Sequence, residues 1–284
     1  MELKKIAAVI LSCAVAGTVF TGCGETPPAQ TQAEEIKMGL LQTLNADTDT
    51  YNKMMAKFEE NAEIKLPHHQ IIFYRNFQTL QEDLISGKID EVSIYKSATD
   101  YLMARNPQIE IAKNHVGKKK IIDNIAFALR AEDTELKNSL DDAISKMQND
   151  RTLDKLITIY ITDFKTPEDL PAVTFENFDG ADTIKVGVTG DLPPMDLILA
   201  DGTPAGFNTA LLSEIGKRLQ KNIEFVKINS ASRAAALTSK KVDISFWAII
   251  PTNESVPLDL DKPEGVELST PYFTDDVIHI DIKK

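Results

Sequence analysis

The sequence predicts an α/β protein with two tandem parallel-sheet lobes. Short apolar runs alternate with amphipathic segments in two series, one beginning near residue 36 and one near residue 182. Such alternation is typical of βαβ units, whose strands form parallel sheets. Both series open on similar strands, Ile36–Leu41 and Ile184–Thr189. Both also contain the tripeptide pattern Lys-hydrophobic-Asp before a later strand, ending at Asp90 in the first series and at Asp243 in the second. We therefore predict an internal duplication with a period of about 150 residues; two unrelated α/β units are the alternative.

The second series has the clearest pattern. We predict a strand, a helix, a strand, a helix and a strand, in that order, at Thr183–Val188, Phe207–Leu219, Asn222–Ile228, Arg233–Ser239 and Ile244–Ile250. Within the first of these helices, Leu211, Ile215 and Leu219 recur at helical spacing. Ligands of open parallel sheets bind beyond the carboxyl ends of the strands, so residues 190–195, 229–233 and 247–252 are the predicted binding loops.

The first series repeats this order and then continues. Its predicted elements are Ile36–Leu41, Asp47–Glu60, His69–Tyr74, Phe77–Ser86 and Glu91–Tyr95, followed by a strand at Asp123–Arg130 and helices at Thr134–Gln148 and Arg151–Tyr160. The second series instead ends in a strand, Val277–Ile282. We predict one lobe at residues 36–165, a linker rich in turn residues at 166–181, and a second lobe at 182–284.

The first 22 residues have the pattern of a signal peptide. Lys4 and Lys5 form a basic start, and the apolar run Ile6–Phe20 is too short to span a membrane comfortably. The following Thr21-Gly-Cys23 resembles a bacterial lipobox, so we predict that Cys23 carries a lipid anchor and that residues 23–35 form a flexible tether. An ordinary signal peptide with an incidental cysteine is the alternative.

Composition excludes some functions. The formal net charge of −12 argues against nucleic acid as a partner, because nucleic-acid binding needs clustered Lys and Arg. A hydrophobic content of 43% is sufficient for a real core. The sequence contains no G-x-S-x-G, H-E-x-x-H, P-loop or G-x-G-x-x-G motif. We therefore predict that the protein is not an enzyme and has no cofactor.

Four segments carry a resemblance to a known family. They are Val186-Gly-Val188 followed by Leu192-Pro-Pro-Met195, Asp201–Asn208, Ala235–Asp243 and Leu268–Phe273. In this order and spacing they resemble the extracellular solute-binding proteins of ABC importers, in particular the family that binds polar amino acids. The resemblance implies lobes of the type II periplasmic binding protein kind. It also implies that the chain crosses from a first lobe into a second and returns to finish the first with helices.

The resemblance also implies where a ligand lies. The loop after the first strand and the loop after the third strand contact the ligand in the family. The corresponding residues of this chain are Asp191, Leu192, Pro194, Met195, Phe246 and Trp247. Trp247 is placed either to stack on an apolar or aromatic ligand or to plug an interface between lobes.

Two departures from the family pattern bear on the ligand. The family has an arginine after the third strand that pairs with the ligand carboxylate, and here Ser255 stands at that position. We predict that Arg233 takes its place, because it begins the helix after the second strand. The segment Ala112–Asp123 is too short for a second lobe, so each series resembles a first lobe that lacks its partner.

The histidines do not suggest a metal site. They are His68, His69, His115 and His279. Neighbours on a strand, such as His68 and His69, point to opposite faces. No acidic or cysteine partner stands at ligand spacing, so we predict that no metal is bound.

Together these observations predict an extracytoplasmic, lipid-anchored solute-binding protein. It would capture amino acids or related small polar solutes for an ABC permease in the membrane. Half-built lobes would leave apolar faces, which leaves homodimerisation open. The alternative is a degenerate solute-binding fold that serves as a protein-interaction or envelope-sensing module.

Overall fold

The predicted strands and helices form where the apolar pattern places them. The first series and its continuation contain β1 (Ile36–Leu41), α1 (Thr48–Ala62), β2 (His69–Tyr74), α2 (Phe77–Ile85), β3 (Glu91–Tyr95), α3 (Lys96–Arg105), β4 (Ile109–Ile111), β5 (Ile121–Arg130), α4 (Thr134–Asn149), α5 (Thr152–Ile157) and the π-helical turn η1 (Thr158–Thr162). The second contains β6 (Thr183–Val188), β7 (Leu197–Ile198), β8 (Pro204–Ala205), α6 (Phe207–Leu219), β9 (Asn222–Lys227), the 3₁₀ turn η3 (Ser230–Ser232), α7 (Arg233–Thr238), β10 (Ile244–Pro251), β11 (Val266–Leu268) and β12 (Phe273–Ile282).

This structure is a computed structural model that describes residues 35–45, 47–63, 69–113, 121–164, 171, 173–252 and 261–283. The predicted signal peptide, Cys23 and nearly all of the predicted tether lie outside the described residues, as do Ser255 and part of the predicted linker. Residues Glu34–Lys284 form one compact unit. Within the described ranges, no helix has both the length and the apolar character that a membrane crossing requires.

Local interactions fix the helix starts. The side chains of Asp47 and Asn76 accept hydrogen bonds from the backbone N–H groups of the first turns of α1 and α2. At the start of α6, Gly206 has a φ of 94°, and a Cβ there would lie 2.4 Å from the Pro194 carbonyl oxygen. Only glycine permits this approach between the start of α6 and the loop after β6.

The described strands form one mixed sheet of ten strands and a separate two-stranded ribbon of β7 and β8. The main path runs β2-β1-β3-β12-β5-β10-β6-β9, with β11 beside β5 and β4 beside β12. At one end β1 pairs in parallel with β2 and β3, and at the other β6 pairs in parallel with β9 and β10. We call the β6 end lobe A and the β1 end lobe B. The predicted α/β class with parallel-sheet lobes is confirmed.

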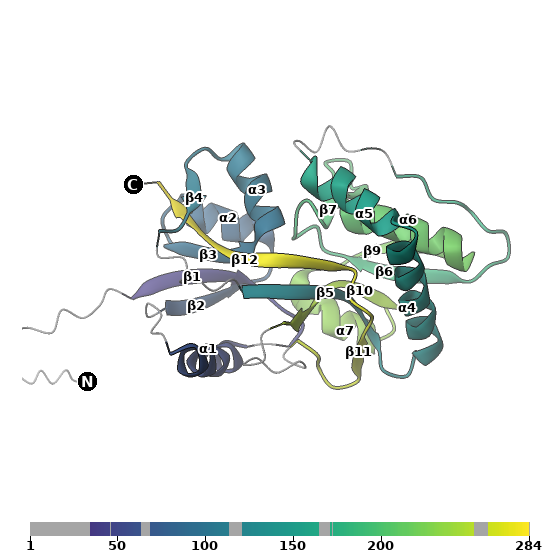
Figure 1. Ribbon diagram of the computed structural model, residues 1–284, viewed down its shortest axis with the longest axis horizontal. Coiled ribbons are helices and arrows are strands. Elements are labelled where there is room, and N and C mark those ends of the chain that lie inside the picture. Colours follow the sequence, from purple (N-terminus) through teal and green to yellow (C-terminus); the bar gives the residue numbers. More distant parts are fainter. Residues whose placement is uncertain are drawn as a thin grey trace, which may run out of the picture. The chain divides into compact units, whose positions relative to one another are not determined.

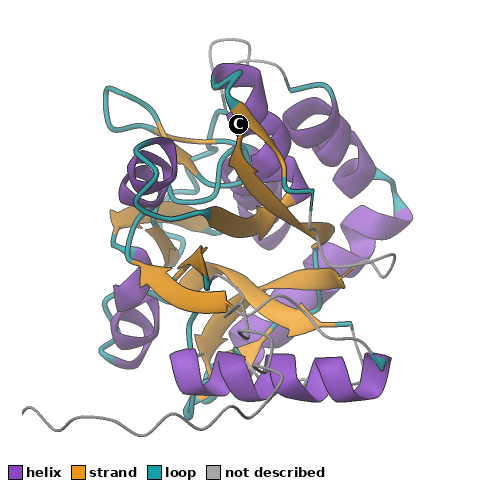
Figure 2. Cartoon of the chain, turned by 90° about the vertical axis from the view of Figure 1, so that its left-hand side faces the viewer, coloured by secondary structure: helices purple, strands orange, loops and turns teal. Residues whose placement is uncertain are grey.

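Helices cover both lobes. In lobe B, α1 lies on one face of the sheet and α2 and α3 on the other (Figure 1); α1 is the long helix along the lower edge of Figure 2. In lobe A, α4 and α5 pack on α6, and the Arg218 Nη2 of α6 donates to the Asp150 Oδ2 at 2.7 Å. The helices that follow the first series therefore finish the lobe of the second series.

Two long strands join the lobes at the centre of the sheet (Figure 1). Their first halves pair with each other, from Ile125 with Phe273 to Ile121 with Val277. On its other edge β5 pairs with β10 from Asp123 to Leu129, and its last residues pair with β11 in lobe A. The rest of β12 pairs with β3 and β4 in lobe B. Each series thus contributes a strand to the lobe of the other. The sequence did not indicate this exchange, because it fixes strands but not their distant partners.

The exchange places the two lobes in an unexpected chain order. The resemblance implies a first lobe, then a second lobe, then closing helices on the first. Here β12 leaves lobe A at the end of the chain, while lobe B and the closing helices α4 and α5 precede β6 in sequence. Relative to the order that the resemblance implies, the observed order is circularly permuted, and the segment after η1 joins the closing helices to the first strand of lobe A.

The two lobes repeat the same local contacts. The Lys37 N–H donates to the Asp90 carboxylate at 2.8 Å, and the Lys185 N–H donates to the Asp243 carboxylate at 2.9 Å. Both central glycines also face the residue before that aspartate: a Cβ on Gly39 would lie 2.6 Å from Ile89, and one on Gly187 would lie 3.6 Å from Val242. These matched contacts are what a duplication would produce, and the duplication itself remains a prediction.

The strand exchange predicts how the chain behaves when it is cut. If a protease site is inserted after Lys165 and cleaved, the two pieces should stay together as one species in size-exclusion chromatography without denaturant. The reason is that β12 from the second piece pairs with β3 and β5 of the first, and β5 pairs with β10 of the second. Separation into two independently folded pieces would contradict this arrangement.

Candidate functional site

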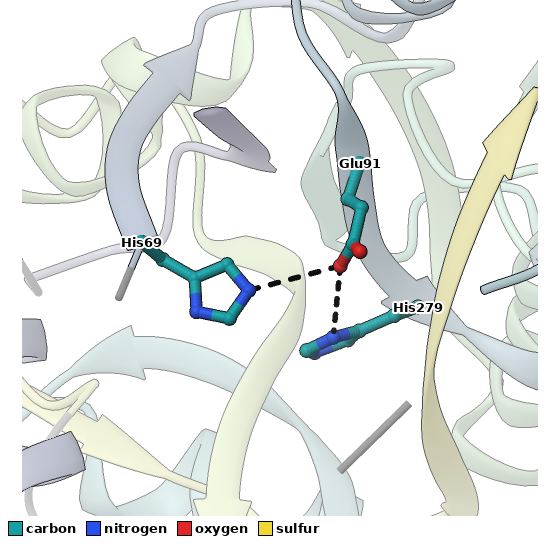
Figure 3. Close-up of side chains that lie close together, drawn as sticks. All are labelled: His69, Glu91 and His279. Carbon is teal, nitrogen blue, oxygen red and sulfur yellow. Dashed lines mark ion pairs between the residues drawn. The ribbon is translucent and has the colours of Figure 1, made fainter. Parts of the chain in front are cut away.

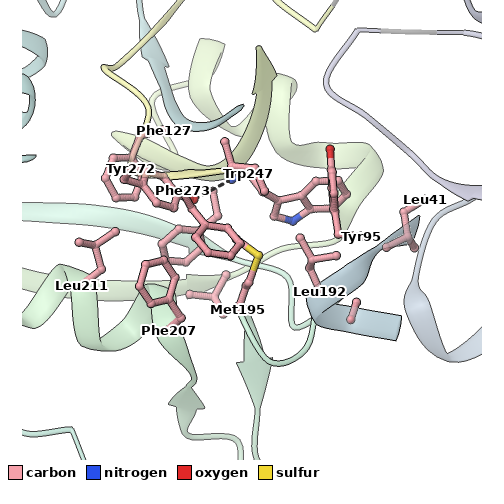
Figure 4. Close-up of a cluster of buried hydrophobic side chains, with 14 of the residues drawn as sticks. Leu41, Tyr95, Phe127, Leu192, Met195, Phe207, Leu211, Trp247, Tyr272 and Phe273 are labelled. Carbon is pink, nitrogen blue, oxygen red and sulfur yellow. Dashed lines mark hydrogen bonds between the residues drawn. The ribbon is translucent and has the colours of Figure 1, made fainter. Parts of the chain in front are cut away.

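The strand ends of the two lobes face each other across the crossing strands. Lobe B contributes the ends of β1 and β3, with Leu41 and Tyr95, and lobe A contributes the loop after β6 and the end of β10, with Leu192 and Trp247. Figure 4 shows these side chains together at one end of a buried cluster that continues through Met195 to Phe207 in lobe A. The carboxyl ends of strands are where open α/β sheets bind ligands.

Arg233 lies at the centre of this interface and is fully buried. Its guanidinium donates to the backbone carbonyls of Ser230 at 3.2 Å, Phe246 at 3.0 Å and Trp247 at 3.2 Å within lobe A. It also donates to the Gln42 carbonyl of lobe B at 2.8 Å. Because these bonds use donors on all three of its nitrogens, Arg233 would have to release some of them to bind a ligand carboxylate.

Carboxylates complete the contacts between the lobes. Asp191, in the loop after β6, accepts from the Phe77 N–H at the start of α2 at 2.9 Å and from the Ser230 hydroxyl at 2.5 Å. Asp261, in lobe A, accepts from the backbone N–H groups of Leu44 at 2.6 Å and Asn45 at 3.1 Å in lobe B. The loop after the first strand of each lobe therefore contacts the other lobe, and this holds the lobes together.

Trp247 has an unusual backbone conformation. Its φ is 39°, in the left-handed region, and the pairing of β10 with β5 shifts register between Ser245 and Ala248. This bulge redirects the side chain, and the indole ring lies over Arg233, with 3.9 Å between the guanidinium carbon and the ring centroid. Such a conformation in a bulky residue costs about 1–3 kcal/mol. This backbone strain lies at the lobe interface.

A cavity of about 140 Å³ lies beside Trp247. Its walls are mostly apolar and come from both lobes, with Leu41, Tyr51 and Met54 on the lobe B side and Leu192 and Ile249 on the lobe A side. Trp247 also lines it, and within the described part of the chain the buried indole N–H of Trp247 has no hydrogen-bond partner. A buried donor without an acceptor is costly, and a ligand oxygen in the cavity would supply the acceptor.

Asp123 and Tyr95 are polar residues that also line the cavity. The Tyr95 hydroxyl donates to the Asp123 Oδ2 at 3.2 Å. Burial raises the pKa of Asp123 to about 6; the hydrogen bond from Tyr95 opposes the rise, and the charges of Asp261 and Asp275 add to it. Asp123 stands on β5 opposite Asp275 of β12, so the crossing strands themselves bring a second carboxylate close.

The structure brings the predicted ligand residues together. All are buried: Asp191, Leu192, Pro194, Met195, Arg233, Phe246 and Trp247. Leu192 and Trp247 line the cavity, whereas Asp191 and Arg233 bridge the lobes. Met195 and Phe246 belong to the apolar core, and the Pro194 carbonyl accepts from the start of α6 at 3.2 Å. Their role in ligand binding remains a prediction.

Asp123 was missed in the sequence. The signal for it was present, since an acidic residue interrupts the apolar run of β5, where Ile125 to Leu129 are all fully buried. Its place in a cavity depends on β12 and α1, which the sequence does not connect to β5.

Comparison with known proteins shows which protein family part of the chain resembles. Residues 184–281, about a third of the chain, match the model of the bacterial extracellular solute-binding proteins, family 3. The predicted resemblance to extracellular solute-binding proteins is therefore confirmed for this segment, which contains most of lobe A and all but the last residue of β12. The matched family binds substrates outside the cytoplasm and is not catalytic. No curated protein matches the chain.

Solved structures with distant similarity include three import proteins. The zinc-bound ligand-binding component of an ABC-type import system from Staphylococcus aureus has 14% identity and a TM-score of 0.42, with 86% of this chain and 65% of that chain covered. A periplasmic substrate-binding protein of an ABC transporter from Coxiella burnetii has 13% identity and a TM-score of 0.41, over 88% of this chain and 85% of that chain. A methionine-bound nutrient-binding protein from Burkholderia cenocepacia has 14% identity and a TM-score of 0.37, over 87% and 84%.

These TM-scores lie below 0.5, so the function of this chain is inferred from the family match and from its own geometry. The chain spans about 65% of the length of the Staphylococcus aureus protein.

The raised pKa of Asp123 predicts a pH dependence of stability. Its pKa is about 6 in the folded protein against 3.8 for the free group, so the folded state binds the proton more tightly between these values. The free energy of unfolding should therefore fall as pH rises from about 4 to about 6, by on the order of 2 kcal/mol for this group. Asp123→Asn keeps an acceptor for Tyr95 and should lose this part of the dependence.

The measurement is urea unfolding of both proteins at several pH values from 4 to 7. Asp196 is buried and also has a pKa raised to about 6, so the wild type and the variant both retain its contribution, and their difference isolates Asp123. Equal pH dependence in the two proteins would show that Asp123 titrates normally.

Proposed function

We propose that the chain is the solute-binding component of an ABC importer, with the solute held in the cavity between lobes A and B. The observation that carries this proposal is a cavity with walls from both lobes, beside the only two strands that cross between the lobes in the described part of the chain. Two crossing strands are a natural hinge. Preferential affinity of the solute for the closed state would then drive closure, and the closed form would be recognised by a membrane permease.

The cavity indicates the class of solute. A volume near 140 Å³ is comparable with a cavity that holds one benzene-sized molecule. The ionised Asp123 favours an amine or another hydrogen-bond donor on the solute, and the Trp247 N–H favours an acceptor. A small amino acid or a related small polar solute with a compact apolar part meets these requirements, and Arg233 is not needed as its carboxylate partner.

The experiment is a thermal-shift screen of residues Gln30–Lys284 against amino acids, small amines and short peptides. A solute at about 100 times its Kd should stabilise the folded state by about 2.7 kcal/mol, which raises the Tm by several degrees. Trp247→Phe removes the N–H but keeps a ring, and Asp123→Asn removes the charge; both should weaken the shift at least several-fold. Tyr160→Phe, which removes one hydroxyl outside the cavity, should leave it unchanged.

A second function is favoured by one observation. Asp191, Arg233 and Asp261 already pair across the lobes, which fits a permanently closed module that binds a protein or senses the envelope. If no solute shifts the Tm at millimolar concentration, solute capture fails and this second function is supported. Neither function is catalytic, and the net charge of −12 gives no reason to propose nucleic acid as a partner.

We also propose that Cys23 is the site of lipid attachment and anchors the protein outside the cytoplasm. The support is the position of Cys23 directly after the apolar leader. In a bacterial host, the full chain should incorporate labelled fatty acid and fractionate with membranes, and Cys23→Ser should lose both properties. Cys13→Ser is the matched control and should behave as the wild type. Label and membrane association that persist in Cys23→Ser would exclude this anchor. Homodimerisation remains a prediction.

A further inference from the structure

Three potential metal ligands converge on one face of the lobe B sheet. His69 lies on β2, Glu91 on β3 and His279 on β12, and Figure 3 shows both imidazole rings directed at the same carboxylate oxygen. The convergence depends on the strand exchange, because β12 brings His279 opposite Ser93, two residues beyond Glu91 on the same face. Sequence spacing could not reveal it.

The distances fit ligands that share one ion. The His69 Nε2 lies 3.7 Å and the His279 Nδ1 lies 3.6 Å from the Glu91 Oε2, and all three atoms lie within 4.8 Å of one another. Zinc bonds of about 2.0–2.2 Å at tetrahedral angles separate two ligand atoms by roughly 3.4 Å. The observed separations are close to this value and longer than a good hydrogen bond of about 2.7–3.2 Å, so a small inward movement would complete the coordination.

The donor set selects the ion. Two imidazole nitrogens and one carboxylate oxygen are a known combination in zinc sites that keep a fourth position open. Mg²⁺ and Ca²⁺ prefer sites made of oxygen ligands. The exposed fractions are 12% for the His69 side chain, 8% for Glu91 and 5% for His279, so the ion would be held largely away from solvent.

The cluster adjoins the cavity between the lobes. His279 and Ser93 both line that cavity, and they stand opposite each other in the pairing of β12 with β3. The cavity therefore reaches one of the three residues of the cluster.

We propose that His69, Glu91 and His279 bind one divalent transition-metal ion of the Zn²⁺ class in lobe B. This site does not depend on the proposed capture of amino acids, because it uses other residues and a different chemistry. The ion would tie β12 to β2 and β3, and thereby fix the strand that crosses from lobe A.

The test is metal binding to residues Gln30–Lys284 purified without a polyhistidine tag. This segment contains the whole compact unit and all four histidines but neither cysteine, so thiols cannot contribute. We expect one Zn²⁺ per chain after dialysis, a rise in Tm with Zn²⁺ but not with Mg²⁺, and visible absorption bands of a four-coordinate ion with Co²⁺.

The variants decide whether these three residues are the ligands. Loss of a residue that only orients a metal ligand typically lowers metal affinity about 10–100-fold. Loss of a ligand itself should cost at least as much, so we expect Zn²⁺ binding to weaken by at least this factor in each of Glu91→Gln, His69→Gln and His279→Gln. His115→Gln changes a histidine that is not one of the three proposed ligands, and it should bind as the wild type does. If His279→Gln fails to fold, the other two variants suffice. The proposal is overturned if the folded wild type binds no Zn²⁺, or if Glu91→Gln and His69→Gln bind it unchanged.

Discussion

The rest of the structure depends on the antiparallel pairing of β5 with β12. Five consecutive residue pairs, from Ile125 with Phe273 to Ile121 with Val277, join two sheets that would otherwise be separate. Beyond this short ladder each strand continues into the opposite lobe, where it supplies a partner for a strand that would otherwise be an edge. Unpaired edges expose backbone groups and invite association with other chains, so the exchange explains how two incomplete lobes form one compact unit.

The same geometry concentrates charge in the interior. Arg233, Asp191 and Asp261 are buried where the loops of one lobe reach the other, and each is satisfied mainly by backbone groups. Buried charges are tolerated when their hydrogen bonds are complete. Trp247 differs from them, because its ring lies over Arg233 while its buried N–H has no acceptor among the described residues.

The two lobes contribute differently to the proposed binding sites. The cavity and the histidine–glutamate cluster share the face of its sheet that carries α1, and both use residues of β3 and β12. Lobe A contributes the family-like loops, but in this structure several of their polar groups hold the lobes together. The proposed solute cavity and the proposed ion site therefore both lie where the exchanged strand β12 meets the first series of the chain.

The sequence alone determined the local elements and the class. The bounds of β1, β2, β3, β6 and α6 follow directly from apolar periodicity and turn residues, because these signals act over a few neighbouring positions. The burial of the predicted residues near the lobe interface could also be anticipated, since the carboxyl ends of parallel strands meet at one edge. The tertiary structure decided which strands pair, and therefore the permuted order of the lobes, the cavity at Asp123 and the convergence of His69, Glu91 and His279. Pairing between strands far apart in the chain depends on packing of the whole sheet, and no local pattern encodes it.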